Sequence, residues 1–228
     1  KINLLKKILY VFKNPLSILS ALQRFLNSTH VVSIKKELEL IFGIPSVKIK
    51  AEIHSIEHHR SHIGSSFFAS SFKNSAILSI DGFGDFTSTM TALGSQNKFK
   101  ILKEINYPHS LGIFYTTVTQ FLGFPNYGDE YKVMGLSSYG KPKYLDKFEK
   151  IINLTDDGLF ILDDRYFRHF KDGVAMQWQG GKPIIGSLFT KCWQDLFGQP
   201  RIKGDKLEQW HIDLATSTQR FTEKVVFH

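Results

Sequence analysis

Two histidines four residues apart are the first feature of this chain that could do chemistry. They are His58 and His62, within residues 57–62, EHHRSH. The sequence predicts a helix over residues 53–70, which would project both imidazoles from one face. Two imidazoles on one helix face can share a divalent metal, as in the helical H-E-x-x-H arrangement.

Asp81 is the candidate for a third ligand, because it closes an apolar run, residues 76–80, that is typical of a buried strand. Two histidines and one carboxylate with open positions form the facial set favoured by Fe²⁺, and Zn²⁺ is also compatible with it. The alternative is a histidine pair that binds no metal and is either exposed on the helix surface or packed against its neighbours. His54, one turn back on the same face, complicates the choice, whereas His59 points elsewhere on the helix.

The glycine-rich segment that follows, residues 81–85, DGFGD, suggests a phosphate contact. Gly82 and Gly84 would allow backbone N–H groups to approach a phosphate closely. The alternative is a plain hairpin turn, because residues 87–93 look like a returning strand. Both interpretations can hold together.

The elements expected around these residues are helices and an antiparallel meander. Predicted strands cover residues 47–50, 75–81, 86–93 and 99–106, and a hairpin covers 157–170. Predicted helices cover residues 2–13, 15–26, 33–42, 113–122, 143–152 and 212–227. A meander that follows a helix favours a mixed α/β or α+β layer fold.

Charge is concentrated at the start of this 228-residue chain, whose net charge is +8. Residues 1–50 hold nine Lys/Arg against Glu37 and Glu39, a net +7. A basic segment can bind nucleic acid or an anionic membrane. Its apolar residues nevertheless recur at helical spacing, which is more typical of a packed helix with a solvated basic face. The residues with this spacing include Leu4, Leu5, Ile8, Leu9 and Phe12.

The single cysteine, Cys192, excludes an intrachain disulfide and fits a reducing, cytoplasmic compartment. We interpret it as a small buried hydrophobe rather than a reactive thiol. No apolar run approaches the roughly 20 residues needed to span a bilayer.

Four motifs in a fixed order give the chain a family resemblance. They are residues 58–62, HHRSH; 81–85, DGFGD; 108–115, PHSLGIFY; and 128–136, GDEYKVMGL. Together they resemble the O-carbamoyltransferases of nodulation-factor and antibiotic biosynthesis. The resemblance is clear over residues 53–143 and fainter to the end.

The resemblance implies a partial actin/Hsp70/sugar-kinase-like α/β fold, two-lobed, with antiparallel phosphate-loop hairpins and packed helices. It implies that residues 1–228 are part of one transfer domain, truncated at both ends. By position, the metal ligands would be His58, His62 and Asp81, with iron favoured and zinc compatible. A further Asp ligand is expected beyond His228, and a first phosphate loop upstream of Lys1. The second domain, which activates carbamoyl phosphate, is absent.

The same resemblance supplies candidates for catalysis and nucleotide binding. Lys132 would stabilise developing charge, Glu130 would orient Lys132 or the acceptor, and His109 would face the cleft. Each has a structural alternative: a solvated lysine, a salt bridge, and a packing histidine at a helix start. Nucleotide contacts are expected from Gly82, Gly84, Gly128 and Gly135.

The expected activity is transfer of a carbamoyl group from carbamoyl-adenylate, made from carbamoyl phosphate and ATP with Mg²⁺, to a hydroxyl of a small-molecule or sugar acceptor. No nucleic-acid partner is expected, and an oligomer is compatible with the sequence. One alternative is an ATP-dependent kinase of the same fold, against which the histidine pair argues. Another is a basic RNA- or membrane-binding module, and a third is a fragment that is inactive alone.

Overall fold

The computed structural model describes residues 2–13, 34–174, 176–179 and 182–228. The predicted helix 15–26 lies outside these residues. Helices α1 (Ile2–Lys13) and α3 (Ile34–Phe42) confirm two of the predicted helices. The predicted strand 47–50 is wrong: the 3₁₀ helix η2 (Ser46–Lys48) stands there, because backbone N–H groups bond to carbonyls of the same turn.

Helix α1 meets the rest of the chain through polar and aromatic side chains. Lys6 pairs with Glu104, and the Tyr10 ring packs edge-on against Phe86 and Tyr107. The predicted apolar packing face of this helix is not buried against the described residues. Its exposed members are Leu5, Ile8, Leu9 and Phe12.

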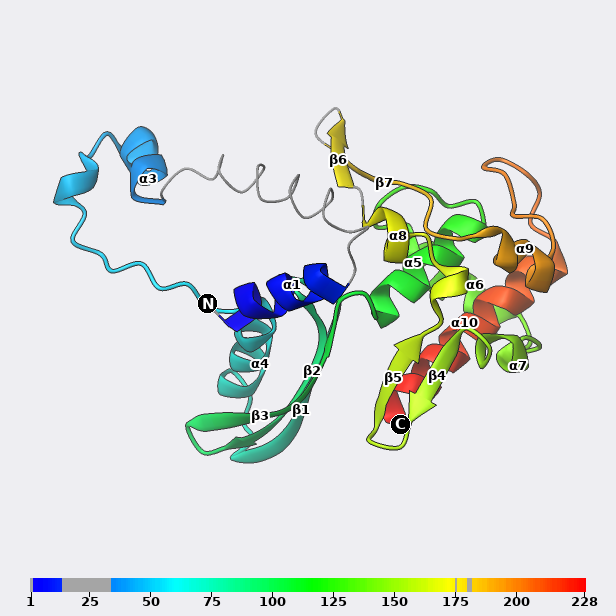
Figure 1. Cartoon of the computed structure of the whole chain (residues 1–228), viewed down its shortest axis with the longest axis horizontal. Helices are drawn as coiled ribbons and strands as arrows, with labels where there is room; N and C mark the ends of the chain where they lie inside the picture. The colour runs from blue at the N-terminus through cyan, green and yellow to red at the C-terminus, as the bar shows by residue number, and fades with distance from the viewer. Residues whose placement is uncertain (1, 14–33, 175, 180–181) are drawn as a thin grey trace.

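A three-stranded antiparallel sheet forms the first part of the fold (Figure 1). It runs in the order β1 (Asn74–Gly84), β2 (Thr87–Ser95) and β3 (Lys98–Asn106), which confirms the predicted meander. Its β1–β2 register shifts between Ile80 and Gly84. The end of β1 is therefore irregular where Asp81 stands, and it turns back through Asp85 at a positive φ of 57°.

Helix α4 (His58–Phe68) covers one face of this sheet (Figure 1). Ile63 packs against Met90 and Ala92, so the helix is held by a small apolar core. The helix begins later than predicted, because the Glu57 side chain caps it by accepting the Arg60 N–H at 2.8 Å. Residues 53–57 are therefore not helical.

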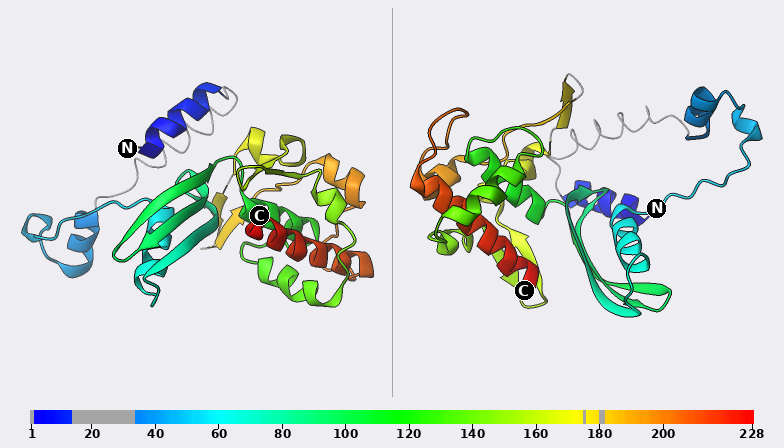
Figure 2. Two further views of the ribbon diagram at one scale, coloured as in Figure 1. Left: turned by 90° about the horizontal axis from the view of Figure 1, so that it is seen from below. Right: turned by 180° about the vertical axis from the view of Figure 1, so that it is seen from behind.

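A group of helices lies beside the sheet, joined to it through α5 (Figure 2). Its main members are α5 (Leu111–Phe121), α6 (Glu130–Leu136), α9 (Lys191–Phe197) and α10 (Gln209–Phe227). Shorter elements are α7 (Leu145–Phe148), α8 (His169–Asp172), η3 (Ser137–Tyr139) and η4 (Asp164–Tyr166). Aromatic side chains dominate the shared core: Phe114, Phe121, Phe148, Trp193 and Phe221. Cys192 is half-buried and packs against this core.

Two small antiparallel hairpins complete the described chain, β4 (Ile152–Thr155) with β5 (Leu159–Leu162) and β6 (Met176–Gln179) with β7 (Lys182–Ile185). The predicted helix 143–152 shrinks to α7, because the chain turns at its end to pair as β4 with β5. The predicted hairpin 157–170 is also displaced. Its first strand, β5, pairs with the preceding strand β4, and the 3₁₀ helix η4 stands where its second strand was predicted. The described helices include none that is both long and apolar enough to cross a bilayer.

Asp213 on α10 binds the loop that precedes α7. Its carboxylate accepts the Lys141 N–H at 2.9 Å and Gln209 Nε2 at 3.0 Å, and it pairs with Lys143 Nζ at 2.7 Å. Burial alone would raise the pKa of this carboxyl, but these hydrogen bonds outweigh it and lower the pKa to about 2. Asp213→Asn should therefore cost about 1–2 kcal/mol of unfolding free energy at neutral pH.

The pH dependence of that cost follows from the lowered pKa. The carboxylate stabilises the fold fully above the unfolded pKa of about 3.9 and loses this contribution as the pH falls towards 2. Urea denaturation of both proteins between about pH 7 and pH 2 should show the stability difference shrink on acidification. A difference that stays constant with pH would contradict the assignment.

Candidate metal centre

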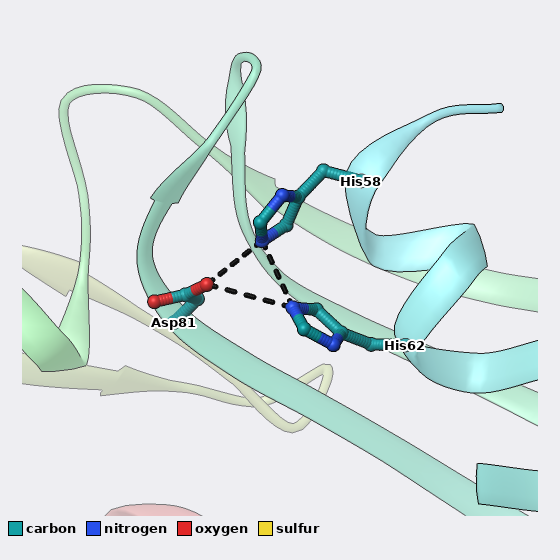
Figure 3. A group of neighbouring side chains, drawn as sticks. All are labelled: His58, His62 and Asp81. Carbon is teal, nitrogen blue, oxygen red and sulfur yellow. Dashed lines mark hydrogen bonds and ion pairs between the residues drawn. The ribbon is translucent and has the colours of Figure 1, made fainter. Parts of the chain in front are cut away.

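The end of β1 and the first turns of α4 bring three predicted ligands together. His58 Nε2 lies 2.8 Å from Asp81 Oδ2 and 2.9 Å from His62 Nε2, and His62 Nε2 lies 3.7 Å from the same carboxylate oxygen (Figure 3). The three side chains are 39–53% exposed, so the site opens to solvent. The predicted constellation is thus a spatial cluster in the structure.

The donor set fits a divalent cation. A proton can bridge one pair of these atoms at a time, whereas a cation can be shared by two imidazole nitrogens and a carboxylate oxygen. Asp81 offers Oδ2, because its Oδ1 already accepts the Gly82 N–H at 2.6 Å. Burial raises the pKa of the Asp81 carboxyl, but hydrogen bonds from His58 and Gly82 outweigh it, and the net pKa is lowered. The carboxylate is therefore ionised, as a ligand must be.

His54 does not join the cluster. It precedes the helix, is largely exposed, and pairs with Glu52 at 3.6 Å. The expectation that it shares the helix face of His58 is wrong, because α4 begins only at His58. The cluster therefore has two histidines rather than three.

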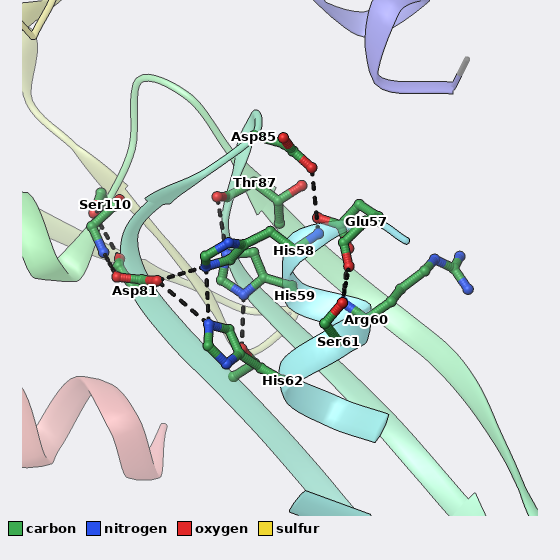
Figure 4. Close-up of polar contacts among 12 residues, drawn as sticks. Glu57, His58, His59, Arg60, Ser61, His62, Asp81, Asp85, Thr87 and Ser110 are labelled. Carbon is green, nitrogen blue, oxygen red and sulfur yellow. Dashed lines mark hydrogen bonds and ion pairs between the residues drawn. The ribbon is translucent and has the colours of Figure 1, made fainter. Parts of the chain in front are cut away.

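His59 points away from the cluster, as predicted, and the structure shows that it points into the sheet. Its ring is fully buried, and it contacts Ser79 Oγ at 2.8 Å and the Thr87 carbonyl at 3.0 Å (Figure 4). Burial lowers the pKa of this imidazole.

The two glycines after Asp81 have different surroundings. A Cβ on Gly84 would lie 2.0 Å from His58 Cδ2, whereas a Cβ on Gly82 would meet nothing within 4 Å. Gly84 therefore leaves the room that the His58 ring occupies. Gly82 keeps an open flank, which is compatible with the predicted phosphate contact.

This difference gives a paired prediction. Gly84→Ala should push the His58 ring aside and weaken binding of a divalent metal about 10-fold or more. Gly82→Ala should leave metal affinity within about 2-fold, because its position is open and its N–H remains. Isothermal titration of metal-free protein with Zn²⁺ would measure both, and equal affinities in the two variants would contradict the packing role of Gly84.

Two residues at the start of α5, which sequence reasoning missed, hold the Asp81 end of β1. The Ser110 hydroxyl lies 3.2 Å from the Asp81 carbonyl and 2.5 Å from the Gly82 carbonyl, and its oxygen also caps α5 by accepting the Ile113 N–H. A Cβ on Gly112 would lie 2.8–2.9 Å from backbone atoms of Asp81 and Gly82. A serine at a helix start is a local sequence signal, but its hydrogen bonds to the carbonyls of β1 depend on tertiary packing.

The predicted catalytic residues have other partners within the described part of the chain. Lys132 Nζ pairs with Asp129 Oδ1 at 2.7 Å, and this hydrogen bond raises the lysine pKa. Glu130 Oε1 accepts the Thr116 hydroxyl at 2.6 Å. Asp129 and Thr116 are not members of the cluster, so the catalytic roles of Lys132 and Glu130 stay predictions.

His109 immediately precedes Ser110, but its ring contacts the β4–β5 hairpin and not the cluster. Its Nδ1 accepts the Leu162 N–H at 3.1 Å, and burial lowers the pKa of its ring. The ring lines a cavity of about 500 Å³ between β3 and the β4–β5 hairpin. This arrangement agrees with the alternative of a packing histidine at a helix start, and a role of His109 in the reaction stays a prediction.

The remaining predicted nucleotide contacts, Gly128 and Gly135, flank α6. Gly128 has φ +87°, a conformation that favours glycine, and a Cβ at either position would meet nothing within 4 Å. Their open surroundings neither hold a ligand nor exclude one, so these contacts also stay predictions.

Comparison with known proteins places this site in a family context. Residues 11–228 match the family described as carbamoyltransferase N-terminus. The chain is 40% identical over 172 residues to the uncharacterized protein sll1178 of Synechocystis, covering 75% of this chain and 26% of that protein. It is 34% identical over 214 residues to the nodulation protein NolNO of Sinorhizobium fredii, covering 91% and 28%. It is 33% identical over 174 residues to the nodulation protein NolO of Bradyrhizobium diazoefficiens, covering 76% and 27%. The chain thus spans about a quarter of the length of these curated relatives.

Proposed function

Because the chain belongs to the carbamoyltransferase N-terminal family, we propose that it forms part of a transfer domain that moves a carbamoyl group to a hydroxyl of a small-molecule or sugar acceptor. The donor in this proposal is carbamoyl-adenylate, made from carbamoyl phosphate and ATP with Mg²⁺. The observation that carries the proposal is the convergence of His58, His62 and Asp81 in a chain of this family.

The proposed fold is part of a two-lobed actin/Hsp70/sugar-kinase-like domain. The antiparallel β1–β2 hairpin with its irregular turn, followed by α5, supports it. Because the chain matches only about a quarter of each relative, the activation of carbamoyl phosphate is assigned in this proposal to sequence outside residues 1–228. The same applies to the first phosphate loop and to a fourth metal ligand. We expect the enzyme to act in the cytoplasm.

The side chains proposed to hold the metal are His58, His62 and Asp81, with iron favoured and zinc compatible. A metal bound there would supply a Lewis acid that polarises the carbonyl or holds the phosphate of the donor. The Gly82 N–H keeps Oδ1 of Asp81 occupied, so that Oδ2 faces the histidines. Ser110 holds the backbone carbonyls behind this carboxylate and so fixes its direction.

Charge stabilisation is assigned to Lys132 in this proposal. Its side chain is about one-third exposed and its ammonium pairs with Asp129, so the ammonium can turn towards a phosphate group by exchanging that partner. Glu130, whose Oε1 accepts the Thr116 hydroxyl, is assigned the role of orienting Lys132 or an acceptor hydroxyl. The phosphate of the donor is proposed to approach on the open side of Gly82, where a Cβ would meet nothing within 4 Å.

The experiment that tests this function supplies the donor directly. The full-length protein, which adds to residues 1–228 the sequence to which the fourth ligand and the first phosphate loop are assigned, should contain metal when it is purified without oxygen. With carbamoyl-adenylate and a panel of hydroxylated acceptors it should release AMP together with an O-carbamoylated product detected by mass spectrometry. A kinase of the same fold would instead convert ATP to ADP and phosphorylate the acceptor. That outcome, or protein free of metal, would overturn the proposal.

A further inference from the structure

We propose that His59 is the positioning residue of the metal centre: it fixes the first turn of α4 against the β1–β2 hairpin and so holds His58 and His62 opposite Asp81. The inference rests on the proposed function, because it concerns the site that would hold the metal. It assigns a role to a residue that is not itself a ligand.

The hydrogen bonds of His59 tie the helix to both strands of the hairpin. Its Nε2 faces the Thr87 carbonyl on β2 at 3.0 Å, and its Nδ1 faces the Ser79 hydroxyl on β1 at 2.8 Å. A carbonyl only accepts, so Nε2 carries the proton, and Nδ1 of the neutral ring accepts from the serine. Both ring nitrogens are therefore used, and the ring has one orientation that satisfies them.

These two anchors lie on either side of the carboxylate ligand. Ser79 stands two residues before Asp81 on the same face of β1, and Thr87 pairs with Gly84 beyond it. The strand segment that bears Asp81 is irregular, because the register shifts there. The His59 bonds consequently fix the helix to the regular pairs that flank this segment.

The ring also contacts both histidine ligands. Its centroid lies 5.4 Å from that of His58 and 6.1 Å from that of His62, with steep interplanar angles of 69° and 70°. A shift of the His59 ring therefore moves the surfaces against which both ligand rings rest. Figure 4 shows it between the two ligands and the strands.

The position of His59 in α4 indicates that its ring orients the helix and does more than fill the core. The buried residues of this helix are His59, Ile63 and Phe67, one per turn on a single stripe. An apolar side chain is the default at such a position, and burying an imidazole costs desolvation unless it is hydrogen-bonded. Beyond its burial, the imidazole contributes two hydrogen bonds that orient the first turn of α4, which bears His58 and His62.

Metal affinity separates positioning from stability. His59→Phe keeps an aromatic ring of similar size but removes both hydrogen bonds, and it should weaken Co²⁺ binding by about 10–100-fold and alter the Co²⁺ absorption spectrum. His59→Gln, whose amide can still donate to Thr87, should restore most of the affinity. Ser79→Ala removes one anchor and is the milder variant, with an intermediate loss of affinity even if His59→Phe does not fold.

Ile63→Val is the matched control, because it trims the next residue of the same buried stripe and should lower the unfolding temperature without changing Co²⁺ affinity. Affinities are compared at a temperature where circular dichroism shows each variant folded. Wild-type affinity in both His59→Phe and Ser79→Ala would overturn the positioning role and leave the proposed function standing. Failure of the wild type to bind Co²⁺ would overturn both.

Discussion

Protein carrying His62→Ala is expected to contain far less than one metal ion per chain after anaerobic purification. Its metal-free form should unfold at the same temperature as the metal-free wild type. The imidazole supplies one of the three clustered donor atoms, and two remaining protein ligands leave too few bonds to hold the ion through purification. The side chain is 53% exposed, so its loss alone should change stability by less than about 0.5 kcal/mol. Metal analysis and thermal denaturation with and without a chelator measure the two quantities separately.

The control for this variant is His54→Ala. It also removes one imidazole from the same stretch of chain, but His54 lies outside the cluster and is largely exposed. It should retain the wild-type metal content. His58→Ala should behave like His62→Ala, because its Nε2 lies within 2.9 Å of both other donor atoms. Equal metal content in wild type, His58→Ala and His62→Ala would remove the basis of the proposed site.

The three clustered residues could be predicted from the sequence because each depends on a local pattern. The spacing of His58 and His62 follows from helical periodicity, and Asp81 follows from the end of an apolar strand. The antiparallel partner of that strand is the next one along the chain, so the meander also follows from local signals. The interpretation of residues 81–85 as a hairpin turn holds in the structure, and the phosphate contact remains a prediction.

The features that the sequence did not reveal depend on contacts between distant elements. Ser79 and Thr87 meet His59 only once β1 and β2 pair under α4, and no short-range pattern marks them as partners of a histidine. The early start predicted for α4 has a different, local cause: the helix begins after the Glu57 cap, three residues before Arg60, and not at residue 53. The predicted helix 143–152 runs too far, because its last residue, Ile152, begins β4 and pairs with Leu162 on β5.

The second large effect is expected from Gly112→Ala at the start of α5. The new Cβ would lie 2.8 Å from the Gly82 nitrogen and 2.9 Å from the Asp81 carbonyl carbon and oxygen. These are backbone atoms, which cannot turn aside as a flexible side chain can, so α5 must withdraw from β1. Withdrawal would also stretch the Ser110 hydrogen bonds behind Asp81. We expect a loss of about 2–3 kcal/mol in unfolding free energy and a weaker metal site.

Gly135→Ala provides the matched comparison, because it makes the same substitution within α6 where a Cβ would meet nothing within 4 Å. Alanine favours a helix over glycine by up to about 1 kcal/mol, so this variant should be as stable as the wild type or more so. The same propensity acts at Gly112 with the opposite outcome, because the backbone clash is larger than the helical gain. Urea denaturation of the two variants therefore compares packing with propensity directly. If Gly112→Ala proved as stable as Gly135→Ala, the close approach of α5 to the strand that bears Asp81 would not be a constraint on this fold.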